Sequence, residues 1–246
     1  MSETVDSAAG AVTAAAPARA RPVRVSIIIP AYNERETIAE ALRRVRAVPC
    51  ETEIIVVDDA STDGTREILE GEAGILLIRH TDNQGKGTAI RSALRVATGD
   101  VIVVQDADLE YAPADIPQLI EPIARGEARV VYGSRFLRGR PRMRPANYLC
   151  NRLLAAAANL LYGARITDEA TCYKAFDGAL LRSLPLTCRR FEFCPEVTAR
   201  VSLRGERIVE VPVRYEARSE DAGKKIRWWD AVHAFWTLFK YRMGAR

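Results

Sequence analysis

The stretch VSIIIPAYNE, residues 25–34, joins a run of β-branched apolar residues directly to a polar segment. The same change occurs in EIIVVDDAST, residues 53–62, and in VIVVQDADLE, residues 101–110. Near-continuous apolar runs are typical of strands buried on both faces, as in a parallel sheet covered by helices. These stretches therefore predict buried strands of an α/β protein, each followed by a polar loop.

Segments with helical spacing lie between the apolar runs. Residues 34–46, 87–96 and 113–124 repeat apolar side chains every three or four positions, which predicts helices. Shorter apolar runs at residues 75–78 and 130–132 predict two more strands. Strand–helix–strand units at this spacing form right-handed crossovers, so the first half predicts a doubly wound, mostly parallel sheet flanked by helices.

The second half has a different pattern, richer in helices. Helical spacing covers residues 147–162, 193–203 and 226–241, and short strands are expected at residues 172–176 and 207–215. We find no linker and no internal repeat after residue 24. The interpretation is a single domain over residues 24–246, divided into halves at residues 24–134 and 135–246.

Composition and charge exclude several classes of protein. The chain has 246 residues and a net charge of +4, too small an excess for nucleic-acid binding through bulk charge. No apolar run approaches the length of a membrane-spanning helix. The five cysteines lack metal-site spacing and are expected to be reduced thiols. Residues 1–23 are Ala-rich without an apolar core, and we expect a disordered leader there.

Carboxylates gather where three of the predicted strands end. Asp58 and Asp59 follow one strand, and Asp106 and Asp108 follow another. Helix caps and turns use such residues too, but capping does not require paired aspartates after two buried strands. Ligands of doubly wound sheets bind beyond the carboxyl ends of the strands. Carboxylate oxygens suit Mg²⁺ or Mn²⁺, and Mg²⁺ is usually shared with substrate phosphates, so a phosphate-bearing substrate is expected.

Basic residues are segregated from these carboxylates. No acidic residue occurs between Arg129 and Thr167, a stretch that holds Arg135, Arg138, Arg140, Arg142, Arg144, Arg152 and Arg165. The planar guanidinium fork matches phosphate oxygens, although a solvated basic face is the alternative interpretation.

Several motifs, taken in order, resemble those of family 2 glycosyltransferases. They are PAYNE at residues 30–34, VDD at 57–59, GKG at 85–87 and DAD at 106–108. The branch that the chain resembles most is the dolichol-phosphate or polyprenyl-phosphate mannose and glucose synthases, and the resemblance covers roughly residues 24–243. It implies the GT-A fold, with residues 24–134 binding the nucleotide sugar and residues 135–246 on the acceptor side.

The resemblance also implies roles for individual residues. The nucleotide would be bound by Pro30, Tyr32, Glu34, Asp59, Gly85, Lys86, Asp106 and Ala107. A divalent cation, Mg²⁺ or Mn²⁺, would be held by Asp106 and Asp108, with Glu110 as a third ligand. Phosphates of donor or acceptor would be held by Arg135, Arg144, Arg218 and Lys224. Asp168 and Arg135 would be the catalytic residues.

The implied reaction is an inverting transfer of mannose or glucose from GDP-mannose or UDP-glucose to a polyprenyl or dolichyl phosphate. A lipid phosphate is already anionic and needs no strong base, whereas a soluble hydroxyl acceptor, the alternative, would need Asp168 as base. A sugar-1-phosphate nucleotidyltransferase, a Rossmann oxidoreductase and a non-catalytic module are disfavoured. The first two lack their Gly-rich loops here, and the third has no need of intact metal ligands.

A lipid acceptor requires contact with a membrane surface. The helical patterns at residues 147–162 and 226–241 carry aromatic and basic residues suited to such contact, and packing against the sheet is the alternative. Trp228 and Trp229 are adjacent, so one of them is expected to be exposed. We expect a cytoplasmic protein that would contact the inner face of the membrane if its acceptor is a lipid. The sequence leaves the oligomeric state open, a homodimer included.

Overall fold

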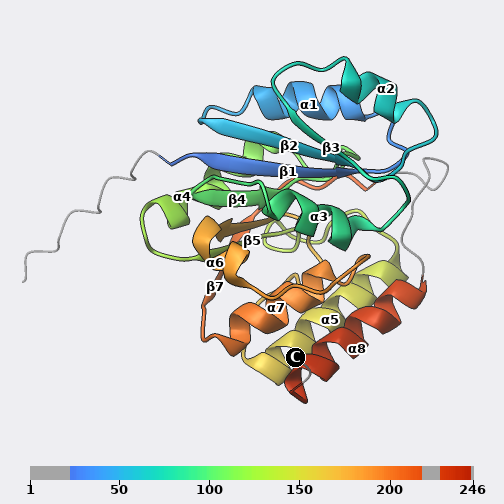
Figure 1. The fold of residues 1–246 in the computed structure, drawn as a ribbon. Helices are drawn as coiled ribbons and strands as arrows, with labels where there is room; N and C mark the ends of the chain where they lie inside the picture. Colours follow the sequence, from blue (N-terminus) through green and yellow to red (C-terminus); the bar gives the residue numbers. More distant parts are fainter. Residues whose placement is uncertain (1–22, 218–227, 245–246) are drawn as a thin grey trace, which may run out of the picture.

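The computed structural model describes residues 23–217 and 228–244. Within these ranges the chain forms one seven-stranded sheet with helices against both faces, as Figure 1 shows. The predicted leader lies outside the described residues except for Val23, and so do the candidate phosphate ligands Arg218 and Lys224.

The sheet has the strand order β3-β2-β1-β4-β6-β5-β7. Its strands are β1 (Val25–Ala31), β2 (Thr52–Asp58), β3 (Leu76–Arg79), β4 (Val101–Val104), β5 (Val130–Ser134), β6 (Lys174–Asp177) and β7 (Ile208–Pro212). All pairings are parallel except those of β6, which runs antiparallel to both β4 and β5. The prediction of a mostly parallel sheet is confirmed, and the second half of the chain contributes β6 and β7 to it.

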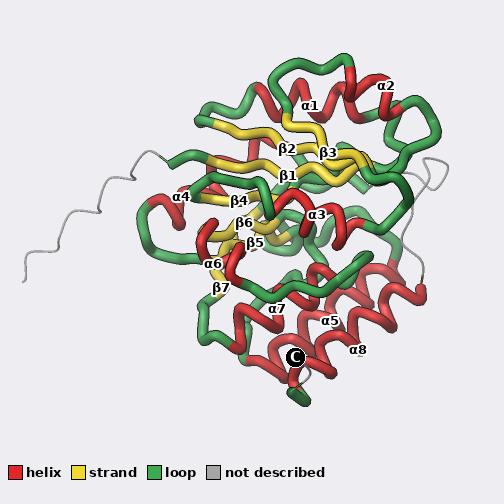
Figure 2. Tube along the Cα trace, in the orientation of Figure 1, coloured by secondary structure: helices red, strands yellow, loops and turns green. Residues whose placement is uncertain are grey.

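Helices connect these strands, as Figure 2 shows. They are α1 (Ile38–Arg46), α2 (Thr65–Glu70), α3 (Lys86–Leu94), the 3₁₀ turn η1 (Pro113–Asp115), α4 (Ile116–Ala124), α5 (Pro145–Tyr162), α6 (Gly178–Ser183), α7 (Phe193–Leu203) and α8 (Trp228–Arg242). The prediction missed α6 and began α1 four residues too early, at Glu34. The Glu34 amide donates to Thr65 Oγ1 at 2.9 Å and the Arg35 amide to Asp63 Oδ2 at 3.1 Å, so these residues anchor a loop instead.

Two apolar cores lie on opposite faces of the sheet. Ile28 belongs to the core that also contains side chains of α3, α5 and α7, whereas its neighbour Ile27 belongs to the core with side chains of α1 and α4. Successive residues of a strand point to opposite faces, so an uninterrupted apolar run such as residues 27–29 fills both cores. This confirms the interpretation of the apolar runs as strands buried on both sides.

The first strand lies between β2 and β4, where the order of strand addition reverses. Ala31 at the end of β1 pairs with Asp58 at the end of β2, and the Gln105 amide after β4 donates to the Ile28 carbonyl at 2.9 Å. The loops that follow these three strands therefore meet at one edge of the sheet. A crevice at such a switch point is the usual ligand site of this sheet type.

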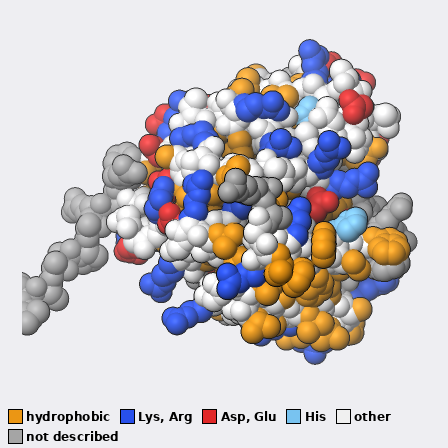
Figure 3. Space-filling view, turned by 60° about the horizontal axis from the view of Figure 1, so that its bottom comes forward, with side chains coloured by type: hydrophobic (Ala, Val, Ile, Leu, Met, Phe, Trp, Pro, Cys, Tyr) orange, Lys and Arg blue, Asp and Glu red, His pale blue; other side chains and the backbone are white. Residues whose placement is uncertain are grey.

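Large apolar side chains are exposed mostly on α5 and α8. Figure 3 shows hydrophobic side chains gathered on the face of the molecule that these two helices form. Among the described helices, none combines the length and the apolar composition that crossing a bilayer would require.

Candidate active site

Backbone strain is concentrated at the carboxyl edge of the sheet. In the described chain the non-glycine residues with positive φ are Asn33, Ala60, Leu109 and Arg165, with φ of 52°, 63°, 62° and 56°. The first three lie in the loops after β1, β2 and β4. Such conformations cost about 1–3 kcal/mol each and cluster at functional sites, where the surrounding structure holds them.

The loops after β1 and β2 are tied to each other. Asn33 Oδ1 accepts from the Thr62 amide at 2.8 Å, and the Asn33 amide donates to Ser61 Oγ at 3.0 Å. The fully buried Asp58 accepts from Arg66 Nε at 2.7 Å, which anchors the start of the loop after β2. The predicted nucleotide ligands are half-buried here, Pro30 at the end of β1 and Tyr32 and Glu34 on the loop that follows it.

Asp59 is buried and holds the loop that precedes α3. Its Oδ1 accepts from the Gln84 amide at 3.0 Å and contacts His80 Nδ1 at 2.6 Å. Its Oδ2 accepts from the Gly85 amide at 2.7 Å. The other ring nitrogen of His80 contacts Ser92 Oγ at 3.0 Å. Both oxygens of this predicted nucleotide ligand are thus engaged in shaping the Gly85–Lys86 loop.

The two glycines of the GKG motif lie against the chain segment Cys188–Arg190. A Cβ atom on Gly85, whose φ is +91°, would lie 2.5 Å from the Arg189 carbonyl oxygen. The Gly87 amide donates to the Arg190 carbonyl at 2.9 Å, and the Thr88 amide to the Arg189 carbonyl at 3.0 Å. Glycine is required because two backbones meet there, and the first amides of α3 are occupied by that segment.

Lys86 extends from this loop to the carboxylate loop after β4. Its ammonium donates to Asp106 Oδ1 and to Cys172 Sγ, the latter at 3.2 Å. Burial alone would lower the pKa of Lys86, but the Asp106 carboxylate outweighs it and raises the pKa well above its usual value. The structure therefore brings together two predicted site residues that α3 and β4 separate in the chain.

The predicted metal ligands Asp106, Asp108 and Glu110 share one loop. Burial first, and then the charges of Asp106 and Glu110, raise the pKa of Asp108 to about 7. The Asp108 carboxylate accepts from the Glu110 amide at 3.0 Å, and Glu110 Oε2 accepts from the Tyr215 hydroxyl at 3.1 Å. Repelling hard-oxygen donors fit a divalent cation such as Mg²⁺ or Mn²⁺. In the described parts of the chain no three His, Cys, Asp or Glu side chains form a ready metal cage.

Arg135 and Asp168 form a buried ion pair at the end of β5. Arg135 Nε and Nη2 each donate at 2.7 Å to the two carboxylate oxygens, and the Arg135 amide adds a third bond at 3.0 Å. Glu210 on β7 accepts from the amides of Thr167 and Asp168 and so fixes the segment that carries the carboxylate. The Asp168 side chain has no exposed surface, so its carboxylate does not reach an acceptor in this arrangement.

Tyrosines connect the ion pair to the carboxylate loop. Tyr215, which donates to Glu110, lies beneath the Arg135 guanidinium with 5.1 Å between Cζ and the ring centroid. The Tyr111 ring stacks on Tyr173 at 4.8 Å and contacts Tyr215 at 5.3 Å. Through Tyr215 the candidate metal ligand Glu110 and the candidate phosphate ligand Arg135 lie close together.

The sequence did not predict several residues of this site. Their positions gave some indication: His80 lies two residues beyond the strand predicted at residues 75–78, and Tyr111 directly follows the DADLE stretch. No sequence pattern pointed to Cys172 or Tyr215 as site residues. Of the other predicted site residues, Ala107 is a buried member of the carboxylate loop, and Arg144 is exposed at the start of α5.

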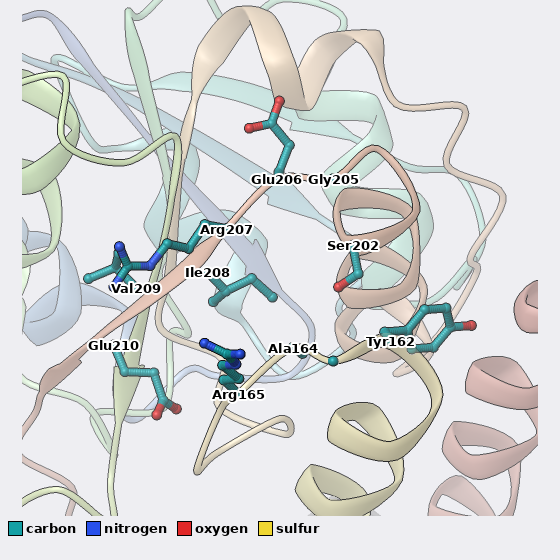
Figure 4. A pocket seen from close by; sticks show the side chains of 11 residues that line it. Tyr162, Ala164, Arg165, Ser202, Gly205, Glu206, Arg207, Ile208, Val209 and Glu210 are labelled. Carbon is teal, nitrogen blue, oxygen red and sulfur yellow. The ribbon is translucent and has the colours of Figure 1, made fainter.

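A separate cavity of about 740 Å³ opens where α5, α7 and β7 come together. Figure 4 shows Arg165, Arg207 and Glu210 among the side chains that line it. The Ser202 hydroxyl, also in its wall, is buried without a hydrogen-bond partner among the described residues. None of the predicted site residues lines this cavity, which adjoins the candidate site through Glu210.

Comparison with known proteins agrees with the geometry. The model of the family described as "Glycosyl transferase family 2" matches residues 26–182 of this chain. An undecaprenyl-phosphate mannosyltransferase from Micrococcus luteus is 32% identical over 211 residues, which span 80% of this chain and 85% of the relative. The matched part of this chain spans 59% of the length of a second relative and 65% of the length of a third.

Solved structures share the fold. Glucosyl-3-phosphoglycerate synthase from Mycobacterium tuberculosis in complex with UDP superposes with a TM-score of 0.66 at 25% identity, covering 91% of this chain and 81% of that one. A mannosyltransferase from Pyrobaculum calidifontis in complex with GDP-Man and Mn²⁺ has a TM-score of 0.54 at 25% identity, covering 80% and 57% of the two chains. The GT-A fold predicted from the motifs is confirmed.

Proposed function

The chain belongs to glycosyl transferase family 2, and from that membership we propose that it moves a hexose from a nucleotide diphosphate sugar to a polyprenyl phosphate, inverting the anomeric centre. The carboxylate loop of Asp106–Glu110, held beside Arg135 through Tyr215, carries this proposal. A cation site and a guanidinium next to each other suit a substrate with several phosphates. The name of the Micrococcus relative supports the lipid phosphate as acceptor.

The nucleotide would lie in the crevice beyond β1, β2 and β4. Pro30, Tyr32 and Glu34 would contact its base and ribose, while Asp59 keeps the Gly85–Lys86 loop in place. GDP-mannose and UDP-glucose are the proposed donors, because the two similar structures hold GDP-Man and UDP. The hydrogen bonds between the two loops would keep this crevice at a fixed width before the nucleotide binds.

The diphosphate would leave between the carboxylate loop and Arg135. Asp106 and Asp108 would hold Mg²⁺ or Mn²⁺ there, with Glu110 kept close by Tyr215. When bound, the cation neutralises charge that develops on the leaving diphosphate. Lys86 holds Asp106 in position until the substrate is bound. Arg135 has five N–H donors, of which Asp168 engages two through its side-chain bonds, so others can point at phosphate oxygens.

An anionic lipid phosphate needs no general base, which fits the geometry of Asp168. A carboxylate that accepts two Arg135 bonds and has no exposed surface is suited to orienting that arginine. Transfer to a soluble hydroxyl, with Asp168 as base, is the second candidate. The likeness to glucosyl-3-phosphoglycerate synthase favours it, and Asp168 would then have to leave Arg135.

Ligand-induced thermal stabilisation tests the donor part of the proposal. A nucleotide diphosphate at about 100 times its Kd should stabilise the fold by about 2.7 kcal/mol, and Mn²⁺ should increase the shift. Asp108→Ala should abolish the metal-dependent part, whereas Glu121→Ala, on the surface of α4, should keep it. The absence of a shift with every guanine and uridine nucleotide would overturn the assignment.

Acceptor assays separate the two candidates. Labelled GDP-mannose and UDP-glucose are offered with undecaprenyl phosphate in detergent or with 3-phosphoglycerate, and the products are identified by mass spectrometry. We expect a hexose-phosphate lipid. Exclusive labelling of 3-phosphoglycerate would replace the lipid with the soluble acceptor.

A further inference from the structure

Helices α5 and α8 pack against each other and turn apolar side chains outward. On α5, Leu149, Leu153 and Leu160 are 59%, 51% and 87% exposed; on α8, Trp229, Trp236 and Phe239 are 56%, 60% and 46% exposed. These six side chains define the α5/α8 face, which Figure 3 shows as a cluster of hydrophobic side chains. A surface helix ordinarily presents polar residues to water, so this face calls for a partner.

Packing of the core does not account for the apolar side chains on the outer sides of α5 and α8. The opposite side of each helix is apolar as well and already fills the core, through Leu154 and Ala158 on α5 and Leu238 on α8. The Tyr162 hydroxyl donates to the Leu238 carbonyl and locks the two helices together. The α5/α8 face is therefore a rigid surface rather than an incomplete part of the core. Contiguous exposed apolar patches mark protein or membrane contacts.

The charges around the face select the kind of partner. Helix α5 contains no acidic residue, and the exposed Arg152 lies within its apolar stripe. Helix α8 ends with Lys240 and Arg242, and Asp230 is its single acid. A two-fold contact between copies of this chain would bring these cations together. Tryptophan and leucine flanked by cations instead suit the interface of a bilayer with anionic lipids.

Arg152 connects this face to the candidate active site. Its Nη1 donates to the Thr167 carbonyl at 3.2 Å, and its Cζ lies 5.4 Å from the centre of the Phe136 ring. Arg135 contacts the same ring at 5.9 Å. Arg152 therefore stands between the exposed leucines and the buried arginine of the site, where a headgroup phosphate could be passed from one guanidinium to the other.

We propose that the α5/α8 face docks on the surface of an anionic bilayer, with its tryptophans and leucines in the interface and Arg152 at the level of the lipid phosphates. The docking stands on the face alone, while the delivery of an acceptor phosphate toward Arg135 rests on the proposed function. No part of the chain needs to cross the membrane for this arrangement.

Sedimentation with vesicles tests the docking. The full chain should pellet with phosphatidylglycerol vesicles, less with phosphatidylcholine vesicles, and its tryptophan emission should shift to shorter wavelength. Trp236→Glu and Leu153→Glu should each weaken binding at least tenfold. Leu76→Glu, a matched exposed residue on edge strand β3, should bind like the unchanged protein. Thermal melting and nucleotide binding establish that each variant is folded.

Three outcomes would overturn the docking: no binding of the unchanged chain to either vesicle, unaltered binding by both face variants, or a dimer in analytical ultracentrifugation that these variants dissociate. The last would assign the face to a second copy. Activity separates docking from function. With a water-soluble short-chain prenyl phosphate the variants should match the unchanged chain, and with vesicle-embedded undecaprenyl phosphate they should lose activity. If the unchanged chain glycosylates neither acceptor, the proposed function fails while the vesicle result stands.

Discussion

At the residue scale, three side chains surround the guanidinium of Arg135. Asp168 binds it edge-on through two oxygens, the Tyr215 ring lies beneath it and Phe136 lies beside it. A planar, permanently charged group fits such a frame, whereas a flexible ammonium does not. Because these contacts are complete without substrate, Arg135 is already oriented for its proposed role in binding a phosphate. Preorganised charge of this kind stabilises developing negative charge at no cost of reorganisation.

Arg135→Lys should therefore lower kcat/KM for hexose transfer by about 100-fold, the usual effect of removing one preorganised donor. Arg214→Lys is the matched control, because Arg214 also makes two side-chain bonds and one amide bond to a buried aspartate, Asp115, outside the candidate site. Steady-state kinetics and melting temperatures of both variants decide the matter. Equal kinetic losses in the two would make the Arg135 pair structural.

The joint between α3 and the Cys188–Arg190 segment shows how elements far apart in the chain build the site. The carbonyls of Arg189 and Arg190 cap the first turn of α3, and Asp59 fixes the preceding loop. Lys86 projects from this joint to Asp106. The position of the lysine thus depends on a close backbone approach at Gly85 and Gly87.

Gly87→Ala should open this joint. The added Cβ would lie 2.9 Å from the Cys188 carbonyl carbon and 3.0 Å from the Arg190 oxygen, both backbone atoms. Overpacking of this kind costs about 1–3 kcal/mol, which urea unfolding measures, and nucleotide affinity should fall with it. Gly71→Ala at the end of α2, where the nearest atom would be 3.5 Å away, is the control and should stay within about 0.5 kcal/mol. Equal stability of the two variants would contradict a tight joint.

The sequence pattern predicted the parts of the site that depend on local order. Apolar runs placed the ends of β1, β2 and β4 at one edge, and their carboxylates followed. The direction of β6 was not predictable, because its pairing with β4 joins segments some seventy residues apart in the chain, from Val101–Val104 to Lys174–Asp177. The same applies to the Arg135–Asp168 pair. The motif comparison suggested Asp168 as a general base. In the structure, β5 packs beside the segment that Glu210 holds, and both carboxylate oxygens of Asp168 are bonded to Arg135.

A polar cluster in the interior links the sheet to the helical layer at the scale of the whole molecule. The Tyr132 hydroxyl on β5 contacts Thr198 Oγ1 on α7 at 2.8 Å, and Thr198 donates to Glu169 at 3.2 Å. The Lys174 ammonium on β6 donates to the Glu169 carbonyl at 2.7 Å and lies 4.1 Å from the Tyr132 ring. Buried polar networks stabilise a fold only when their members are satisfied. Glu169 Oε2, buried without a partner among the described residues, is the weak member.

That carboxyl should give the stability of the molecule a distinctive pH dependence. Burial raises the pKa of Glu169 from 4.5 to about 7, against the smaller opposing effect of Lys174. Between these two values the folded chain keeps a proton that the unfolded chain releases, so the free energy of unfolding falls as pH rises through this window and levels off above it. At about 1.4 kcal/mol per pKa unit, the loss is up to about 3 kcal/mol.

Glu169→Gln should remove this loss, because an amide does not ionise. Urea unfolding at closely spaced pH values should give a variant that gains stability relative to the unchanged chain as pH rises from 4.5 to 8, by up to about 3 kcal/mol. Glu121→Gln, whose side chain is half exposed on α4, should follow the unchanged chain throughout. Parallel profiles for Glu169→Gln and the unchanged chain would mean that the carboxyl is already ionised in the fold, with Lys174 as its counter-charge.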